Sequence, residues 1–346
     1  MRFRRPGSTQ QDLFGQLEHA RQMSEKTTPL DKLSDAIDFE IFRDLLLDLL
    51  GYRDRLDKGG NSPFDPVFML KIIVLQKFYG LSEERTEFDI MDRFSFMRFL
   101  KVAPGDKLPD KNTIWDFKEK LGLEGVSQLF DYLDEKLLEQ GILGKEGVSV
   151  DASFVDVPKQ RNSRKENAAI KNGEVPEGWD EDHSRRQCQK DLDARWAKKN
   201  NEIHYGYKNH VKSDNATKLI RRWLVGAANE HDSQCLTDLL SCDDGSIHAD
   251  SAYRSKAIMA ELRRLKIKAQ ICQKGQKDKP LPPAQKQANR KKSRIRARVE
   301  HIFGAQAHMN AEFIRTIGIF RAARGIGLGN FVYNLTRSSH LGVNLG

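Results

Sequence analysis

The periodicity of the apolar residues changes near Gly141, and this change divides the chain into two regions of different secondary structure. Before it, apolar side chains recur every three or four residues, as in residues 65–80 (DPVFMLKIIVLQKFYG), which is typical of helices. After it, residues 147–157 (GVSVDASFVDV) alternate apolar and polar side chains, which is typical of a half-buried strand. We therefore expect an all-helical region over residues 1–140 and a region with a sheet over residues 141–346.

The helical region contains several segments with clear start and stop signals. In the segment quoted above, Asp65 is suited to cap the helix, Pro66 to its first turn and Gly80 to its end. The start of the chain, residues 1–35, is polar, and we expect its first part to be poorly ordered. Helical patterns also predict helices at residues 38–51, 82–91, 93–100, 113–125 and 126–139.

The second region predicts a mixed sheet flanked by helices, because three early strands are followed by alternating helices and strands. Residues 275–292 read as a linker, and the polar residues 158–203 read as an inserted mobile loop. The predicted strands after the first are residues 203–213, 219–228, 246–253 and 266–273, and the predicted helices are residues 232–241, 255–265 and 293–309.

Positive charge is concentrated in one part of the chain. Residues 251–300 contain 16 Lys or Arg against three acids, whereas the whole chain has a net charge of +9, so the remaining residues carry a slight excess of acid. A concentrated basic segment favours a polyanionic partner, because neutralising phosphates releases condensed counterions. A solvated basic loop without a specific partner is the alternative.

No apolar run approaches the roughly 20 residues that a membrane span needs. The basic residues of the first eleven positions are not followed by an apolar stretch, so we expect no secretory signal. From these features we expect a soluble intracellular protein without a membrane partner.

Three acidic residues stand out by their positions in the predicted elements. Asp151 lies in the middle of the first strand, on the face opposite Val148 and Val150. Asp250 lies at the carboxyl end of a later strand, where ligand sites gather in sheets with parallel strands. Glu300 flanks the apolar stripe of the helix at residues 293–309. Taken singly, each acid could instead be an exposed strand residue, a turn residue or a surface partner of Arg296.

Together the three acids suggest a metal-dependent reaction at phosphorus. Cleaving a DNA phosphodiester requires an activated oxygen nucleophile and a stabilised leaving oxygen, and two divalent ions about 4 Å apart supply both. Carboxylate oxygens suit Mg²⁺, and bound cations relieve the repulsion between clustered carboxylates. We therefore expect Mg²⁺ as the cofactor, with Mn²⁺ as a substitute.

Several segments in order resemble the DDE transposases of bacterial insertion sequences, most closely the insertion-sequence-five family. The resemblance covers roughly residues 60–335 and implies a catalytic core similar to ribonuclease H and retroviral integrase. Carried over by position, the catalytic and metal-binding acids of the family fall on Asp151, Asp250 and Glu300. The segments that carry it are FDPVFMLKIIVLQKFYGLS, LPDKNTIWDFKEKL, VSVDASFVDVP, HYGYKNHVK, HADSAYRS and RARVEHIFG.

Related transposases often place a tyrosine, arginine, glutamate and lysine at fixed spacing around the last acid. Here Arg296 and Glu300 match, but Ser293 stands at the tyrosine position and Ala307 at the lysine position, which puts the grip on the terminal phosphates in doubt. Only 49 residues separate Asp250 from Glu300, so no large inserted domain fits between them.

Further residues are candidates for contacts to DNA. Around the acids these candidates are Lys208, Tyr253, Arg254, Arg294, Arg296 and Arg298, for each of which packing or a solvated face is the alternative. In the helical region, residues 109–121 resemble the second half of a helix-turn-helix, with Lys111, Asn112 and Lys118 available to bases. Alternatively, Trp115 and Phe117 anchor that helix in a core.

The resemblance implies a transposase that binds terminal inverted repeats, cleaves the ends of the element and joins the 3′-hydroxyls to target DNA. Pairing two DNA ends implies a homodimer or higher oligomer, acting in the cytoplasm at the bacterial nucleoid. Two alternatives remain: a structure-selective metal-dependent nuclease, and a non-catalytic DNA-binding protein on the same scaffold.

Overall fold

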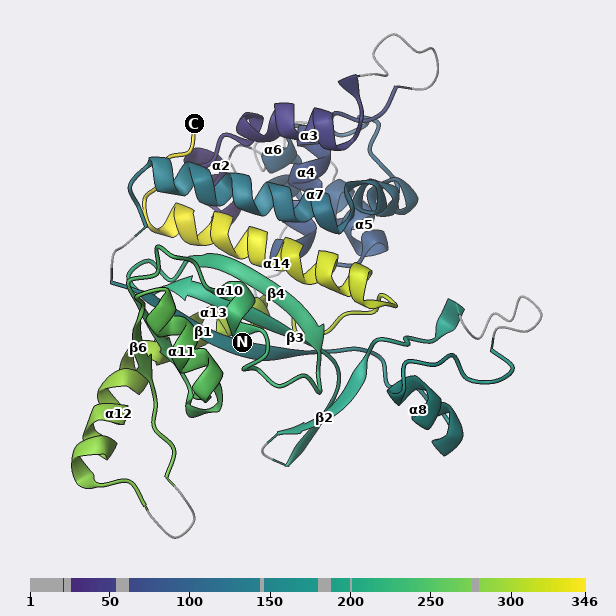
Figure 1. The fold of residues 1–346 in the computed structure, drawn as a ribbon. Helices are drawn as coiled ribbons and strands as arrows, with labels where there is room; N and C mark the ends of the chain where they lie inside the picture. The colour runs from purple at the N-terminus through teal and green to yellow at the C-terminus, as the bar shows by residue number, and fades with distance from the viewer. Residues whose placement is uncertain are drawn as a thin grey trace, which may run out of the picture.

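A helical region lies against a mixed sheet, and one long helix, α14 (Ile319–His340), runs between the two (Figure 1). The computed structural model describes residues 21, 26–53, 62–143, 146–179, 188–199, 201–275 and 280–346. The expectation of poor order at the start of the chain falls on residues that lie outside these ranges. The first helix after them, α2 (Pro29–Ala36), has a capping box formed by Thr28 and Asp31.

The helices before residue 140 begin and end close to the predicted positions. The described elements are η1 (Phe39–Phe42), α3 (Arg43–Leu49), α4 (Pro66–Phe78), α5 (Glu83–Asp92), α6 (Phe94–Leu100) and α7 (Lys111–Glu139). The Asp65 carboxylate accepts hydrogen bonds from the first amides of α4, which confirms the predicted cap. The two helices predicted within residues 113–139 are continuous except at Gly122, where a positive φ of 64° kinks α7.

The hydrophobic core of the helical region continues into the sheet region. Leu75 and Leu133 belong to the same buried cluster as Val211 of the sheet and Phe331 of α14. The sequence pattern indicates no helix at residues 319–340, although α14 contains 22 residues. Since almost all of residues 322–335 of α14 are buried, its sequence lacks the apolar stripe that marks a surface helix.

The sheet has six strands, and its order explains how distant residues become neighbours. Its main path is β2–β3–β1–β5–β6, with β4 paired to β3. Strands β3 and β4 run antiparallel to their neighbours, whereas β1, β5 and β6 are parallel. The strands are β1 (Val148–Asp156), β2 (Arg195–Lys199), β3 (Glu202–Asp214), β4 (Ile220–Ala227), β5 (Ser246–Ala249) and β6 (Lys268–Ile271).

Helices cover both faces of this sheet, as predicted. One face carries α14 and α13 (Glu300–His308), and the other packs α10 (Leu236–Leu239) and α11 (Lys256–Arg264) against the cluster around Val150 and Ile247. The helix predicted at residues 232–241 is therefore much shorter than expected, with only four residues in α10.

Two predictions for the polar segments were wrong. Most of the expected linker at residues 275–292 is helical, because α12 (Pro283–Arg296) begins within it and continues to η4 (Ala297–Val299). The expected loop at residues 158–203 contains α8 (Arg164–Lys171), whose capping box joins Ser163 and Glu166, and also β2. α12 buries no residue, so its sequence lacks an apolar stripe.

None of the helices in the described ranges is long and apolar enough to cross a membrane.

Candidate active site

The register of two parallel strands sets two of the predicted acids side by side. In the pairing of β1 with β5, Val148 lies beside Ile247 and Ser149 beside His248. Asp250 follows β5 with extended backbone angles (φ −71°, ψ 166°), so continuing the register by two residues sets it beside Asp151. Neighbouring positions on adjacent strands share a face of the sheet. The backbone therefore places Asp151 and Asp250 at neighbouring positions at the carboxyl end of β5, and the charges of both raise the pKa of Tyr253.

The guanidinium of Arg296 links Asp151 to the third predicted acid, Glu300. Its Nη1 donates a hydrogen bond to Oδ2 of Asp151, and its Nη2 lies 3.8 Å from Oε1 of Glu300. Arg296 is the last residue of α12 and Glu300 the first of α13, with η4 between them. The helix predicted as continuous over residues 293–309 is thus interrupted by a 3₁₀ turn beside the acid.

Buried side chains hold α13 in this position. Val299 and Ile302 are fully buried in the cluster that includes Val211 of β3. Farther along α13, Gln306 donates a 2.6 Å hydrogen bond to Asn330 of α14, which in turn exchanges hydrogen bonds with Asn209 of β3. A sheet strand and two helices are therefore joined beneath the segment that carries Glu300.

The acids lie in different environments. Burial raises the pKa of Asp151, and the charges of Arg296 and Lys199 oppose this shift while Asp232 adds to it. The Asp151 side chain is 17% exposed, whereas that of Glu300 is 65% exposed. Asp250 is also exposed, and its carboxylate accepts a 2.6 Å hydrogen bond from the amide of Ser251. One acid is thus withdrawn from water and two face it.

The donor atoms of this site suit a hard cation, although the side chains are not arranged around one. Within the described ranges, no three His, Cys, Asp or Glu side chains converge as a metal-binding group. The positive group that lies between two of the acids is the guanidinium of Arg296, which contacts Asp151 and approaches Glu300. Carboxylate oxygens around a positive charge fit Mg²⁺ chemically, provided that Arg296 moves aside.

Two buried polar side chains near the acids have no hydrogen-bond partner among the described residues. They are Tyr253, through its hydroxyl, and His210, through both ring nitrogens. Burial raises the pKa of Tyr253 well above its usual value, with further contributions from Asp232 and Asp151. Burial lowers the pKa of His210 to about 4, so the imidazole is neutral at physiological pH.

Asp232 is an acid of this neighbourhood that the sequence analysis did not single out. Its carboxylate accepts a 2.7 Å hydrogen bond from Lys208, and its charge raises the pKa of Tyr253, His210 and Asp151. Asp232 lies five residues after the end of β4, in the segment NEHDS, where the sequence marked only the start of a helix. Its position after a strand, like that of Asp250, was the available signal.

The candidate DNA contacts near the acids differ in accessibility. Arg254, Arg294 and Arg298 are exposed, although Arg298 also donates to the carbonyl of Asn215 at 2.6 Å. Lys208 is 9% exposed and donates to both Asp232 and the carbonyl of Glu230. Lys208 is occupied by these contacts and Tyr253 is buried, which disfavours direct contact of either side chain with DNA. The predicted DNA contacts of these two residues stay predictions.

The candidate base-reading segment lies at the start of α7, and only part of it is free to meet DNA. Asn112 is exposed, and Lys111 is exposed but donates to Glu84. Lys118 is buried, donating to Gln76 and Glu83, and burial lowers its pKa. Of the two residues expected to anchor this helix in a core, Phe117 is buried whereas Trp115 is 43% exposed.

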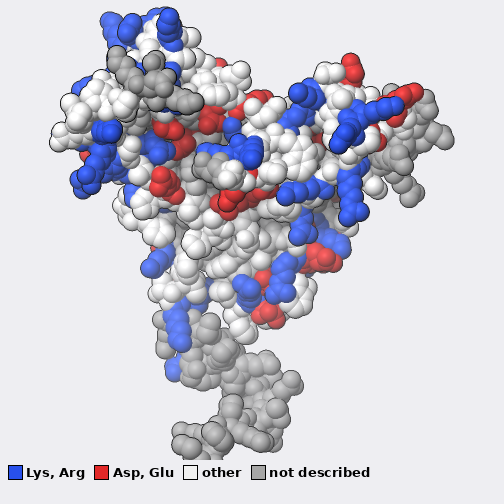
Figure 2. Space-filling model, turned by 90° about the horizontal axis from the view of Figure 1, so that it is seen from below, with Lys and Arg blue, Asp and Glu red and all other residues white. Residues whose placement is uncertain are grey.

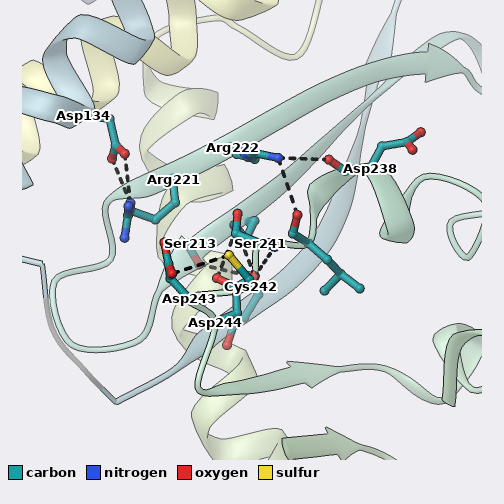
Figure 3. A network of polar contacts seen from close by, with 12 residues as sticks. Asp134, Ser213, Arg221, Arg222, Asp238, Ser241, Cys242, Asp243 and Asp244 are labelled. Atoms are coloured by element: carbon teal, nitrogen blue, oxygen red, sulfur yellow. Dashed lines mark hydrogen bonds and ion pairs between the residues drawn. The ribbon is translucent and has the colours of Figure 1, made fainter. Parts of the chain in front are cut away.

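A cavity of about 910 Å³ lies away from the acids, between α7 and β4. Two arginines of its lining form hydrogen bonds across the cavity wall (Figure 3): Arg221 donates to Asp134, and Arg222 donates to the carbonyls of Asp238 and Leu240. Burial raises the pKa of Asp134. The pair of Arg221 with Asp134 joins α7 to the sheet, and the lining also holds Asp131, Glu135 and Asp243.

Comparisons with known families agree with this geometry. Residues 142–335 match the family model described as a transposase DDE domain, and residues 18–120 match one described as a transposase domain (DUF772). No solved structure matches the chain. Together the two domains are typical of bacterial insertion-sequence transposases. Enzymes of this family transfer nucleotidyl groups and use divalent metal ions. A DDE domain has a ribonuclease H-like fold. The predicted fold class is thereby confirmed, whereas the finer assignment to the insertion-sequence-five family stays a prediction. The chain belongs to the DDE transposases.

Proposed function

We propose that this transposase binds the terminal inverted repeats of its element, cleaves the ends and joins the 3′-hydroxyls to target DNA. Asp151, Asp250 and Glu300 are its catalytic acids in this proposal. The observation that carries the assignment is the meeting of three elements distant in sequence: the β1–β5 register aligns Asp151 with Asp250, and Arg296 links Asp151 to Glu300.

The same three carboxylates would hold the divalent ions, for which we propose Mg²⁺, with Mn²⁺ as a substitute. When bound, such ions act as Lewis acids on the two sides of the reacting phosphorus. The protein contributes the positions of the acids: Asp151 is fixed in a paired strand, and Glu300 begins a helix whose next turns are buried. Arg296 pairs with Asp151 and lies 3.8 Å from Glu300, and in this proposal it also contacts a phosphate of the bound DNA.

DNA binding is supported by the basic surface beside the acids. α12 carries six Lys or Arg and no acid, and four of these cations are exposed: Lys286, Arg290, Lys291 and Arg294. Figure 2 looks onto the face from which α12 projects, with the basic side chains of α12 toward the left and those around α8 toward the right. Such a surface binds phosphates through counterion release.

A homodimer or higher oligomer completes the proposal, because joining two ends of one element requires both ends in a single complex. The exposed Arg254, Arg294 and Arg298 are the proposed phosphate contacts, and Asn112 at the start of α7 is a proposed base contact.

The test is an assay with purified protein, Mg²⁺ and labelled duplexes that carry an element end. The wild type should produce cleaved ends and then joined products. Asp151→Asn, Asp250→Asn and Glu300→Gln should each reduce both products by several orders of magnitude while DNA binding in the absence of metal is retained.

Asp243→Asn is the matched control, because Asp243 is an exposed acid at the cavity between α7 and β4, away from the acids. Normal joining by Asp151→Asn or Asp250→Asn would refute the assignment of the acids. Cleavage that ignores the terminal repeats and yields no joined product would instead identify a structure-selective nuclease.

A further inference from the structure

Strand β3 is longer than the sheet that it belongs to, and its first part forms an arm with β2. Residues 206–214 of β3 pair with β1, whereas residues 202–206 pair with Arg195–Lys199. The change occurs at Gly206, where φ is 153° and an added Cβ would lie 2.3 Å from the carbonyl oxygen of Val155. Figure 1 shows this two-stranded arm (residues 195–199 and 202–206) projecting from the sheet on the side away from the helical region.

One side of the arm presents apolar side chains to solvent. Ile203 is 58% exposed and Trp196 is 45% exposed. The Trp196 ring packs on Tyr205, its cross-strand partner, with 4.6 Å between ring centroids, and Tyr205 is itself buried. Lys198 lies opposite Ile203 in the same register and is also exposed. The arm therefore carries an aromatic and an aliphatic side chain on a rigid base, next to a cation.

The root of the arm is fixed to the rest of the protein. Arg195 donates hydrogen bonds to the carbonyls of Leu192 and Ile170, which ties β2 to the end of α8. On the other side of the arm, His204 stacks on Phe154 with 4.0 Å between ring centroids. Phe154 lies three residues after Asp151 on β1, so the arm is connected rigidly to the strand that carries a catalytic acid.

An exposed two-stranded ribbon with an apolar side is a liability in a protein without a partner for it, because it promotes association between molecules. Charge indicates the class of partner. In the described part of residues 158–203, seven Lys or Arg are exposed against three exposed acids. An excess of cations around the arm is complementary to a polyanion.

We propose that the arm is a DNA-binding element that enters a groove of the duplex beside the cleavage site. A two-stranded ribbon is one of the elements that the major groove of B-DNA admits, and apolar or aromatic side chains contact bases there while lysines contact phosphates. This inference rests on the proposed function, because it assumes that the duplex to be cut lies at Asp151.

The position of the arm predicts where on the DNA the contact occurs. The root of the arm, at the pair of Asp156 with Gly206, is five residues along β1 from Asp151, or about 17 Å. At 3.4 Å for each base pair, this is about five base pairs of duplex. A duplex that ends closer than this to the cleaved bond cannot reach the arm, and a longer one can.

The experiment measures Kd, in the absence of metal, for two series of duplexes that extend 3, 6, 9 and 12 base pairs to either side of the cleavage site. In the series that extends toward the arm, the wild type should bind more tightly once the duplex reaches more than about five base pairs from the cleavage site. The double variant Trp196→Ala, Ile203→Ala should lose this gain, with binding to the longest duplex weakened roughly 5- to 150-fold, the range for loss of a stacking contact. The matched control Leu138→Ser, an equally exposed apolar residue at the end of α7, should retain it.

A second variant tests the charged part of the arm. Lys198→Ala, Lys199→Ala should lower the slope of log Kd against log salt by about two, since each phosphate contact contributes roughly 0.9. An unchanged length-dependent gain and salt slope in these variants would overturn the inference. So would a change in oligomeric state without DNA, which would identify a second copy of the chain as the partner. If the wild type binds no end-containing duplex at any length, it is the proposed function that fails.

Discussion

The guanidinium of Arg296 forms an ion pair with the carboxylate of Asp151, 145 residues earlier in the chain. Both side chains are largely shielded from water, with 23% and 17% of their surfaces exposed. Because burial alone raises the pKa of Asp151, the cation beside it is what keeps the ionised form tolerable. Arg296 thus supplies a positive charge at Asp151, where we propose that a divalent ion binds.

Replacing Arg296 by glutamine should change how the protein responds to metal. Without the guanidinium, the carboxylates of Asp151 and Glu300 lose their shared cation, and we expect a loss of about 1–3 kcal/mol in the free energy of unfolding. Added Mg²⁺ should restore more stability in the variant than in the wild type, because no arginine has to be displaced. Thermal melts over a Mg²⁺ titration measure both effects.

Arg298→Gln is the control for this variant, since Arg298 contacts Asn215 and Glu146 instead of the three acids. An equal Mg²⁺-induced rise in Tm in Arg296→Gln, Arg298→Gln and wild type would show that Arg296 does not compete with metal.

The elements that could be predicted from the sequence are those with one buried side. β1 alternates because one face packs against the cluster of Val150 and Ile247, and α4 begins where Asp65 caps it. α14 and α12 showed no such pattern for opposite reasons: most residues of α14 are buried, whereas α12 has no buried residue. A periodicity signal needs two unlike sides, which neither helix has.

The candidate site was predictable only as far as single residues could be placed on elements. Asp151 and Asp250 were found because an acid in a strand, or just after one, is unusual. The interruption of the helix before Glu300 and the link through Arg296 depend on how α12 meets the sheet, which local sequence does not encode. Asp232 was passed over because its proximity to Asp151 arises from the pairing of distant segments.

His210 should make the stability of the protein depend on pH in the acidic range. Its pKa is lowered from 6.5 to about 4 in the folded state because it is fully buried, so the unfolded chain binds a proton there that the folded protein does not. The stability contributed by the neutral imidazole is therefore complete above pH 6.5 and is lost as pH falls toward 4, by roughly 3 kcal/mol. Denaturant melts between pH 4 and 7 measure this loss.

The variant His210→Gln should flatten that part of the pH profile, because glutamine does not titrate. His340, which is exposed at the end of α14, provides the control: His340→Gln should leave the profile as in the wild type. A profile that stays unchanged in His210→Gln would mean that another group titrates in this range.

Tyr253→Phe should separate function from stability. The Tyr253 hydroxyl is buried without a hydrogen-bond partner among the described residues, so its removal should leave the free energy of unfolding unchanged or raise it by about 1 kcal/mol. Cleavage should nevertheless fall if the hydroxyl is used once DNA and metal are bound, since Asp151 and Asp250 both lie close enough to affect its pKa. Chemical denaturation and the cleavage rate at saturating DNA test the two halves. A variant as active as the wild type would make Tyr253 a packing residue.

Asn330 joins β3, α13 and α14, and its replacement should affect both stability and the placement of Glu300. Its side chain is fully buried, accepts hydrogen bonds from Asn209 and Gln306, and donates one back to Asn209. Asn330→Ala leaves the buried amide of Gln306 without its acceptor and leaves the Asn209 amide with only a 3.4 Å hydrogen bond to Gln306, and each buried group that loses its partner costs about 1–3 kcal/mol. We expect a loss of about 2–5 kcal/mol in the free energy of unfolding.

The same change should lower the cleavage rate more than it lowers DNA binding, because Gln306 holds the helix that begins at Glu300. Ser338→Ala is the matched control: Ser338 is also fully buried in α14, but its hydroxyl bonds only to the carbonyl of Asn334 within the same helix. If the two variants lost equal stability and kept equal cleavage rates at a temperature where both are folded, the Asn330 network would be structural and would have no part in positioning Glu300.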